Sequence, residues 1–272
     1  MGNLVLLKLG GSLITDKAKP FTPRLDVITR LAEEIHYARE NSNVKLVVGH
    51  GGGSFPHTPA RDYEIHRGII GPASYRGMAE VQDTAARLNR IVVRALIDAG
   101  ENAISVNPFS CCMAESGIIK YMYIEPLKRL LNYDMIPVPY GDVGFDLKSG
   151  CSILSTEEIL NYIAKIFVKT AKFRPKKILM CGVVDGVFTG DPEKDPDAKI
   201  IPEITTRNIK QVVCHLAGSS GIDVTGGMVL KVKKLLQIAK LGVESEIINA
   251  AKPDVLKRAL LGEEGLGTII RR

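Results

Sequence analysis

The sequence predicts an α/β sandwich built around a mainly parallel sheet. Short apolar strands alternate with longer amphipathic helices along the chain, and several of the strands end in glycine clusters. The chain has 272 residues, of which 45% are hydrophobic and 24% are charged. This composition is that of an ordinary globular protein and excludes disordered, collagen-like and fibrous classes.

The first part of the chain shows the alternation clearly. Asn3–Leu9 is a nearly continuous apolar run, which is typical of a buried strand, and residues 24–39 carry apolar side chains at helical spacing. The same reasoning predicts strands over residues 44–48, 102–106 and 135–138, and helices over residues 76–99 and Glu125–Asn132.

The second part repeats the pattern. Strands are expected over residues 177–180 and 246–249, and helices over residues 155–170, 227–240 and 253–261. Thr225 is expected to cap the helix over 227–240. Two Asp-Pro pairs mark residues 187–198 as rich in turns. The chain has no internal repeat and no low-complexity linker. A boundary between two lobes that share one sheet is expected near residues 170–176.

Charge and cysteine content narrow the function classes. No apolar run approaches the roughly 18 residues that a membrane span needs, and the N-terminus is expected to be a strand, not a signal peptide. The net charge of +6 is mild and scattered, which is explained either by solubility alone or by a small anionic ligand, whereas nucleic acid would need a basic stripe. Five cysteines without a Cys-x-x-Cys motif are expected to be reduced cytoplasmic thiols, neither zinc ligands nor disulfides.

Three glycine clusters carry most of the functional information. The first, Gly10-Gly11-Ser12, follows the strand Asn3–Leu9 and is preceded by Lys8. Glycines let successive backbone N–H groups turn toward a ligand, and such groups form a nest that suits phosphate oxygens. For this pair of glycines alone, a plain turn from strand to helix stays open as the alternative.

The second cluster, Gly51-Gly52-Gly53, follows another predicted strand. Three consecutive glycines cost backbone entropy, so close approach of a ligand explains them better than packing does. The sequence matches neither the P-loop nor the dinucleotide-binding pattern. His57 follows a few residues later and is expected to donate a hydrogen bond to a substrate phosphate, with His50 as the alternative.

The third cluster, Gly226-Gly227, opens a predicted helix, and Lys231 lies about one turn inside it. An anion at this helix start would meet free N–H groups and the lysine together, whereas the alternative is a capped helix with a solvated lysine. The three clusters together predict one polyphosphate site. Phosphoryl transfer depends on positioning and on neutralising charge, which Lys8, Lys17 and Lys231 are expected to supply.

Two further predictions concern the surroundings of this site. Asp142 follows a predicted strand and is expected to hold the lysines by ion pairing. The helix face that carries Met78, Val81 and Ala85 is a candidate pocket for an apolar acceptor, although ordinary core packing is the simpler explanation. The catalytic-loop motifs of protein kinases are absent, which excludes that class.

These motifs together resemble the amino acid kinase superfamily, and most closely its archaeal-type isopentenyl phosphate kinases. The resemblance covers essentially the whole chain, and it rests on KLGGS starting at Lys8, GHGGGSFPH ending at His57, YGD ending at Asp142, DGV starting at Asp185 and DVTGGMVLK ending at Lys231. Serine, phenylalanine and histidine after the glycine loop distinguish this branch from the carboxylate kinases.

The resemblance implies ATP-dependent phosphorylation of isopentenyl phosphate to isopentenyl diphosphate in isoprenoid biosynthesis. It implies a three-layer α/β/α sandwich, a cytoplasmic homodimer, and no nucleic-acid or membrane partner. Mg²⁺ would arrive with ATP, without a dedicated metal cage of protein ligands. The single domain 1–272 would divide into an acceptor-binding lobe over about 1–172 and a nucleotide-binding lobe over about 173–272.

The resemblance also implies a role for each matching residue. The catalytic residues would be Lys8, Lys17, His57, Asp142 and Lys231. The acceptor would lie against Gly52, His57 and Thr156. The nucleotide would lie against Lys8, Gly10, Gly11, Ser12, Gly53, Val183, Gly226, Gly227 and Lys231.

The sequence departs from the family pattern in three segments. Pro56 stands where the family usually has glycine, Thr156-Glu157 where it has Gly-Asp, and Val183 where it has aspartate. A threonine side chain at position 156 is expected to crowd the acceptor phosphate. Two alternatives stay open: a kinase of another small phosphate or phosphonate, such as fosfomycin, and a non-catalytic nucleotide-binding regulator.

Overall fold

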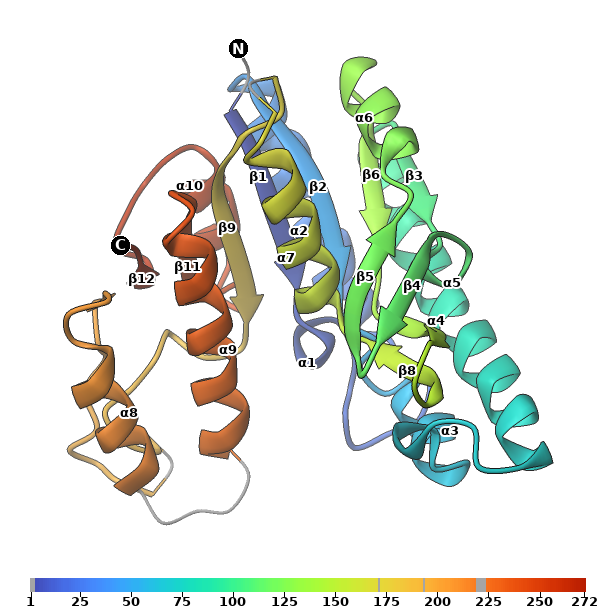
Figure 1. The fold of residues 1–272 in the computed structure, drawn as a ribbon. Coiled ribbons are helices and arrows are strands. Elements are labelled where there is room, and N and C mark those ends of the chain that lie inside the picture. The colour runs from blue at the N-terminus through green and yellow to red at the C-terminus, as the bar shows by residue number, and fades with distance from the viewer. Residues whose placement is uncertain (1–2, 171, 193, 219–223) are drawn as a thin grey trace.

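The computed structural model describes residues 3–170, 172–192, 194–218 and 224–272 (Figure 1). Its strands are β1 (Asn3–Leu9), β2 (Val44–His50), β3 (Ala103–Val106), β4 (Cys112–Glu115), β5 (Ile118–Met122), β6 (Ile136–Pro139), β7 (Asp142–Asp146), β8 (Gly150–Leu154), β9 (Pro175–Gly182), β10 (Glu203–Ile204), β11 (Glu244–Asn249) and β12 (Gly267–Ile270). Its helices are α1 (Gly11–Ile14), α2 (Leu25–Glu40), α3 (His57–Asp62), η1 (Ile65–Arg67), α4 (Pro72–Asp98), α5 (Pro108–Cys111), α6 (Glu125–Asn132), α7 (Thr156–Phe167), α8 (Ile209–Gly218), α9 (Val224–Ala239) and α10 (Val255–Leu260).

The central sheet takes strands from both halves of the chain, in the order β10-β12-β11-β9-β1-β2. The strands from β2 to β11 run parallel, whereas β12 runs antiparallel to β11. An isolated parallel bridge between His50 and Tyr140 continues the pairing toward β6 and its partner β3. The mainly parallel sheet predicted from the sequence is therefore confirmed.

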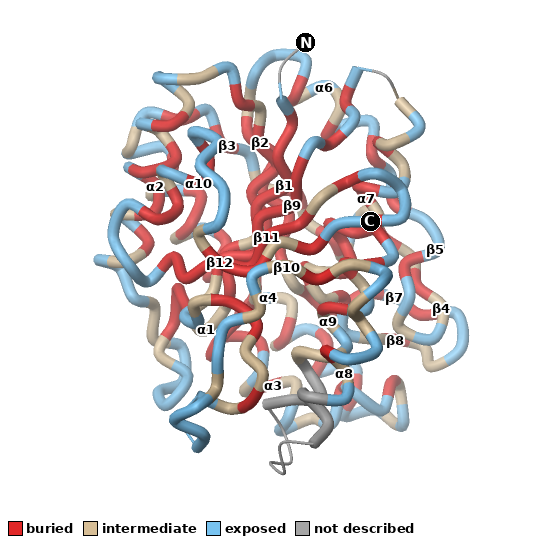
Figure 2. Tube along the Cα trace, turned by 90° about the vertical axis from the view of Figure 1, so that its left-hand side faces the viewer, coloured by how far each residue is buried: buried red, intermediate tan, exposed pale blue. Residues whose placement is uncertain are grey.

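The alternation of side chains along β1 explains the two helical layers. Val5, Leu7 and Leu9 pack into a core with α2, α4 and α10. Leu4 and Leu6 point to the other face and pack with α7, α8 and α9. Because successive side chains of a strand point to opposite faces, an apolar run of this kind requires cover on both sides. The buried strands lie between the exposed outer surfaces of the two layers in Figure 2.

A second sheet, β5-β4-β7-β8, was not predicted from the sequence. Its strands have four or five residues each, which is too short for a clear periodic signal. Val143 and Cys151 of this sheet pack with Met78 and Val81 of α4 in a small separate core. The helix α8 was also missed.

Several element ends differ from the prediction. Helix α4 begins at Pro72, four residues before the predicted start, because proline is favoured in a first turn where the N–H has no partner. Ser155 is the N-cap of α7, and its Oγ accepts a hydrogen bond from the Glu158 N–H at 3.2 Å. Thr225, which was expected to cap α9, lies within that helix. None of the described helices is long and apolar enough to cross a bilayer.

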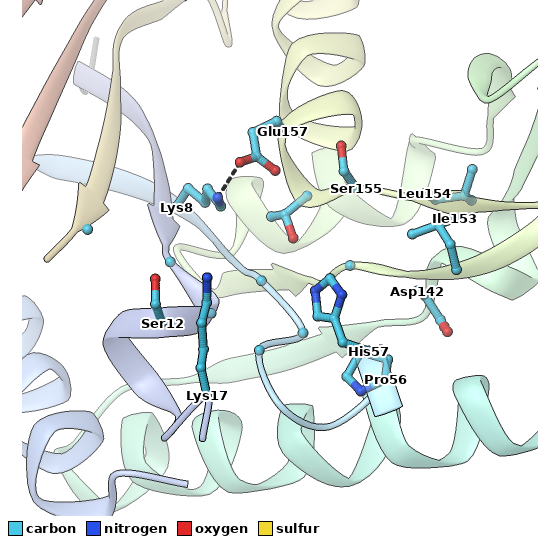
Figure 3. A pocket seen from close by; sticks show the side chains of 18 of the residues that line it. Lys8, Ser12, Lys17, Pro56, His57, Asp142, Ile153, Leu154, Ser155 and Glu157 are labelled. Carbon is cyan, nitrogen blue, oxygen red and sulfur yellow. Dashed lines mark hydrogen bonds and ion pairs between the residues drawn. The ribbon is translucent and has the colours of Figure 1, made fainter. Parts of the chain in front are cut away.

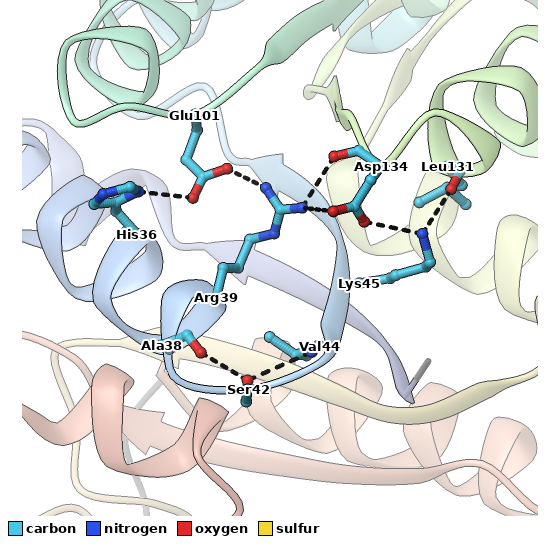
Figure 4. Close-up of polar contacts among 9 residues, drawn as sticks. All are labelled: His36, Ala38, Arg39, Ser42, Val44, Lys45, Glu101, Leu131 and Asp134. Carbon is cyan, nitrogen blue, oxygen red and sulfur yellow. Dashed lines mark hydrogen bonds and ion pairs between the residues drawn. The ribbon is translucent and has the colours of Figure 1, made fainter. Parts of the chain in front are cut away.

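A network of charged side chains ties the amino-terminal ends of the strands together (Figure 4). Arg39 of α2 pairs with Glu101 and lies 3.0 Å from Asp134. His36 Nδ1 lies 3.1 Å from Glu101, and Lys45 Nζ lies 2.9 Å from Asp134. The network joins α2 and β2 to the loops before β3 and β6, at the sheet edge opposite the carboxyl ends of the parallel strands.

Candidate active site

A cleft of about 580 Å³ opens at the carboxyl ends of β1, β2 and β9. Ligands of open α/β sheets bind at this edge, and the volume is within the roughly 300–1,000 Å³ of small-molecule sites. The glycine loops after β1 and β2 both line the cleft, because neighbouring parallel strands end at the same edge. Figure 3 shows side chains from both loops and from α7 converging there.

Most of the predicted site residues line this cleft. They are Lys8, Gly10, Gly11, Ser12, Lys17, Gly52, Gly53, His57, Asp142, Thr156 and Lys231. Val183 is 42% exposed and is not among the lining residues, whereas its neighbours Gly182 and Val184 are. Gly226 and Gly227 fall in the first turn of α9, and their surroundings lie outside what the structure describes.

The loops after β1 and β2 approach each other too closely for side chains. Gly53 has φ of +54°, and a Cβ there would lie 2.1 Å from Thr15 Oγ1. A Cβ on Gly11 would lie 2.5 Å from the Gly53 nitrogen. The Thr15 hydroxyl joins the two loops, because it donates to the Gly11 carbonyl at 2.7 Å and accepts from the Ser54 N–H at 3.0 Å. Close approach of the two backbones and of the Thr15 side chain therefore explains Gly11 and Gly53, so the expectation that a ligand explains the second cluster better than packing is wrong for Gly53.

Lys8 reaches the cleft because of its place in β1. It shares a face with Leu4 and Leu6, so its side chain points toward α7, where it pairs with Glu157 (Figure 3). Burial acts to raise the pKa of Glu157, but the Lys8 ammonium, and to a smaller degree that of Lys231, outweigh burial and hold this pKa below its ordinary value. This pairing of Glu157 with Lys8 was not predicted from the sequence.

The ammonium groups of Lys8, Lys17 and Lys231 lie together at the end of the cleft that holds Glu157. Burial lowers the pKa of Lys231, and the nearby charges of Lys8 and Lys17 lower it further, while Glu157 opposes them. Lys17 lies on the exposed loop after α1. One carboxylate among three lysines leaves an excess of positive charge, which suits a polyphosphate.

His57 begins the short helix α3 and faces the cleft between Lys17 and Asp142 (Figure 3). Partial burial and the Lys17 ammonium lower its pKa, against the opposing effect of Glu157. His50, the alternative for contact with a phosphate, has 0% exposure and does not line the cleft. That alternative is therefore wrong.

The expectation that Asp142 organises the lysines is also wrong. Asp142 is 1% exposed, and its Oδ1 accepts a hydrogen bond from the Val143 N–H at 2.8 Å. Its Oδ2 is buried without a hydrogen-bond partner in the described part of the chain, and burial raises the pKa of this carboxyl group to about 7. The Asp142 side chain leaves the start of β7 pointing away from Lys8 (Figure 3). The carboxylate that pairs with Lys8 is instead that of Glu157.

Two of the departures from the family pattern are accommodated by packing. The Thr156 hydroxyl donates to the His50 carbonyl at 2.6 Å, and Thr156 is only 1% exposed, so its side chain is packed against β2 and does not crowd the open cleft. A Cβ on Gly52 would lie 2.1 Å from Pro56 Cγ, so the proline ring packs directly on this glycine.

Apolar side chains line the far end of the cleft, although the lining of the cleft also includes Arg61 and His66. Ala60, Val81, Ile153 and Leu154 line it beside His57 and Asp142. Ile153 and Leu154 come from β8, at the opposite end of the view from Lys8 (Figure 3). Of the predicted helix face, Val81 lines the cleft and Met78 and Ala85 do not; all three side chains are buried, as the simpler explanation of core packing expected.

Comparison with known proteins agrees with this geometry. The sequence model of the amino acid kinase family matches residues 3–249. The isopentenyl phosphate kinase of Methanothermobacter thermautotrophicus is 38% identical over 98% of both chains, and that of Methanocaldococcus jannaschii is 33% identical over 96% of both. An X-ray structure of isopentenyl phosphate kinase aligns with a TM-score of 0.82 and 35% identity, over 98% of this chain and 100% of that one. The chain belongs to the amino acid kinase family.

Proposed function

We propose that this protein transfers the γ-phosphoryl group of ATP to isopentenyl phosphate, forming isopentenyl diphosphate and ADP. The observation that carries the proposal is one cleft with a lysine-rich end, an apolar end and His57 between them. The full-length similarity to isopentenyl phosphate kinases supports it.

The chemistry needs positioning more than it needs a base. A phosphate monoester has its second pKa near about 6, so the acceptor is largely a dianion at neutral pH and its oxygen is already a nucleophile. That oxygen forms a bond to the γ-phosphorus, while the bond from this phosphorus to the bridging oxygen of ADP breaks. Lys8, Lys17 and Lys231 stabilise the charge on the transferring group, and Glu157 keeps Lys8 directed into the cleft.

His57 holds the existing phosphate of the acceptor. Its lowered pKa favours the neutral imidazole in the empty cleft, and a bound dianion raises this pKa and favours the imidazolium. A charged donor on a phosphate gives a stronger hydrogen bond than a neutral one. Binding of the acceptor therefore creates the charge that holds it.

The apolar end selects the tail of the acceptor. Ile153 is 37% exposed beside the buried Val81 and Leu154, so it can cover part of a short branched hydrocarbon, at about 0.8 kcal/mol for each buried CH₂ group. A small polar phosphonate such as fosfomycin would leave the exposed part of Ile153 uncovered. The isoprenoid acceptor is therefore favoured over the phosphonate.

The remaining assignments belong to the same proposal. Mg²⁺ would accompany ATP and would supply neutralising charge to its phosphates, with water and phosphate oxygens as its expected ligands. Residues 1–172 bind the acceptor and residues 173–272 bind the nucleotide, with Val183, Gly226 and Gly227 on the nucleotide side. The protein is a cytoplasmic homodimer, a state that light scattering in solution tests.

A coupled ADP-release assay with Mg-ATP tests the function directly. Isopentenyl phosphate, dimethylallyl phosphate and fosfomycin are compared at matched concentrations, and turnover with isopentenyl phosphate is expected to be strong. Lys8→Ala and Lys231→Ala are each expected to lower kcat by about 10²-fold, as loss of a preorganised charged group does. Lys233→Ala is the matched control, because Lys233 lies on the same helix but is exposed and does not line the cleft.

Absence of turnover with all three acceptors, in a protein that still binds ATP, would refute the proposal and favour a nucleotide-binding regulator. Unchanged kcat in both lysine variants would show that the phosphoryl group is transferred elsewhere.

A further inference from the structure

A chain of buried polar groups lies beneath the second glycine loop, and none of them lines the cleft. His50 ends β2 with 0% exposure, and Asn89 of α4 is 1% exposed. The side-chain nitrogen of Asn89 lies 3.1 Å from His50 Nε2, and His50 Nδ1 lies 3.2 Å from the carbonyl oxygen of Gly51. The contacts therefore run from a long helix through the imidazole to the loop.

The partners of Asn89 determine where the imidazole carries its proton. Asn89 Nδ2 also donates to the Val138 carbonyl at 3.3 Å, and since a carbonyl can only accept, the amide nitrogen and not its oxygen must lie on this side. The other amide proton then points at His50 Nε2, which must be the unprotonated acceptor. The imidazole proton is consequently on Nδ1, which donates it to the Gly51 carbonyl. Burial lowers the pKa of His50 to about 4, so the ring is neutral at physiological pH.

The histidine is held from other directions as well. Its ring stacks on Tyr140, with centroids 5.6 Å apart and planes inclined by 8°. Its carbonyl accepts hydrogen bonds from the Gly141 N–H at 3.0 Å and from the Thr156 hydroxyl at 2.6 Å. Ring and backbone are therefore fixed together.

This fixed imidazole orients a peptide group that has no side chains of its own. The Gly51 carbonyl faces His50 Nδ1, while the Gly51 N–H donates to the Leu9 carbonyl at 2.9 Å. A trans peptide is planar, with its C=O and N–H pointing in opposite directions. The N–H of Gly52 therefore points away from the imidazole. Gly52 lines the cleft, and its N–H has no acceptor among the described residues.

We propose that His50, held by Asn89 as the neutral Nδ1–H tautomer, is a positioning residue that directs the Gly52 N–H at the phosphate of the acceptor. The identity of that anion rests on the proposed function, whereas the orientation of the peptide does not. Glycine on both sides of this peptide permits rotation, and the bond from Nδ1 removes that freedom. His50 thus prepares a donor for the substrate without touching it.

Histidine-selective ¹⁵N NMR tests the tautomer without any substrate. The chain has five histidines, and the spectrum of His50→Asn assigns the signal of His50 by its loss. An unprotonated Nε2 and a protonated Nδ1, unchanged between pH 6 and pH 8, are expected from the geometry. An Nε2–H tautomer, or titration of His50 within this range, would overturn the proposal.

Substitutions test the link from the tautomer to the loop. His50→Asn keeps an N–H close to the Nδ1 position, His50→Leu keeps none, and Asn89→Leu removes the amide. Thr84→Val is the matched control, because Thr84 lies on the same helix, is 3% exposed, and bonds only to carbonyls of its own helix, at 2.7 Å from Glu80 and 3.1 Å from Val81.

The readouts are the KM for isopentenyl phosphate, the Kd for ATP and the Tm. His50→Leu and Asn89→Leu are expected to raise the KM about tenfold, the effect of losing one hydrogen bond to a charged group, with the Kd for ATP changed by less than about twofold. His50→Asn is expected to recover most of the KM while sharing the loss of Tm. Thr84→Val is expected to lower the Tm alone. A His50→Asn variant with the KM of His50→Leu, or a His50→Leu variant with the KM of the wild type, would refute the positioning role.

Failure of the proposed function is distinguishable from failure of this inference. If the wild type does not turn over isopentenyl phosphate, the same variants are titrated with inorganic phosphate by calorimetry. Weaker phosphate binding in His50→Leu and Asn89→Leu, restored in His50→Asn, would support the positioning role on its own. Unchanged phosphate binding in His50→Leu, or no binding by the wild type, would overturn it.

Discussion

Replacing Glu157 with glutamine keeps the shape of the side chain and deletes the negative charge that faces the lysines. In the described part of the chain, Glu157 is the carboxylate that pairs with Lys8, and its charge also acts on Lys231. At an effective dielectric constant of about 20 and a separation of about 4 Å, one such pair contributes at most about 4 kcal/mol. The side chains of Lys8 and Glu157 are 11% and 24% exposed, so solvent screens part of this energy. We therefore expect kcat to fall about 10- to 100-fold, or about 1.4–2.7 kcal/mol in activation free energy.

The pH profile gives a second readout of the same substitution. Burial and the charges of Lys8 and Lys17 lower the pKa of Lys231, and Glu157 opposes this effect. Without the carboxylate the pKa of Lys231 falls further, so its ammonium form is lost at a lower pH. The alkaline limb of the kcat profile is therefore expected to move to lower pH in Glu157→Gln.

The coupled ADP-release assay, run across pH, measures both effects. Glu158→Gln is the matched control, because the neighbouring Glu158 lies 3.3 Å from Lys234 and does not line the cleft. Glu157→Asp keeps the charge and is expected to retain most of kcat. A Glu157→Gln variant with kcat within about threefold of the wild type and the same alkaline limb would refute the assignment of Glu157, since loss of a buried counter-charge costs more than that.

Three further predictions concern other parts of the cleft. Burial raises the pKa of Asp142 from 3.8 to about 7, so the free energy of unfolding is expected to fall as pH rises from about 4 to about 7, by at most about 4 kcal/mol. Asp142→Asn is expected to remove this pH dependence, which urea unfolding of both proteins at pH 5 and pH 8 measures. If the free energies of unfolding of variant and wild type differ by the same amount at both pH values, the prediction is contradicted. His57→Ala is expected to abolish most acceptor-dependent turnover while calorimetry shows nearly unchanged ATP binding, and unchanged turnover would remove His57 from the acceptor site. Gly53→Ala places a Cβ 2.1 Å from Thr15 Oγ1 at φ of +54°, so a loss of about 2–4 kcal/mol in unfolding free energy is expected, whereas Gly71→Ala meets nothing within 4 Å; equal Tm values for the two would contradict the account.

Long apolar runs made the core of the fold predictable. Strands β1, β2 and β9 contain apolar runs that point to both faces because helices cover both sides of the sheet, and such runs are visible in sequence. The sequence of β11 has fewer apolar residues, with Ile247 and Ile248 between buried polar side chains. The strands β4, β5, β7 and β8 were missed, because each has four or five residues and their pairing joins residues as far apart in the sequence as Met113 and Phe145.

The phosphate-binding end of the site was predictable for a related reason. Glycine and lysine at the ends of parallel strands must meet at one sheet edge, so Lys8 and the two glycine loops could be assigned together. The partner of the lysines could not be assigned in this way. Asp142 follows the predicted strand over residues 135–138, whereas Glu157 lies at the start of the predicted helix over residues 155–170. Only the folded structure shows which of the two carboxylates faces the lysines.

By itself, the sequence determined the alternation of strands and helices, the positions that must be glycine, and the lysines beside those glycines. These are local properties, because they depend on the period of apolar residues and on the absence of a Cβ. The tertiary structure decided which carboxylate neutralises the lysines, which residues line the apolar end, and which histidine is buried beneath the loop and which faces the cleft. These choices depend on distances between residues as far apart as Lys8 and Glu157, or His50 and Asn89, which the order of residues along the chain does not contain.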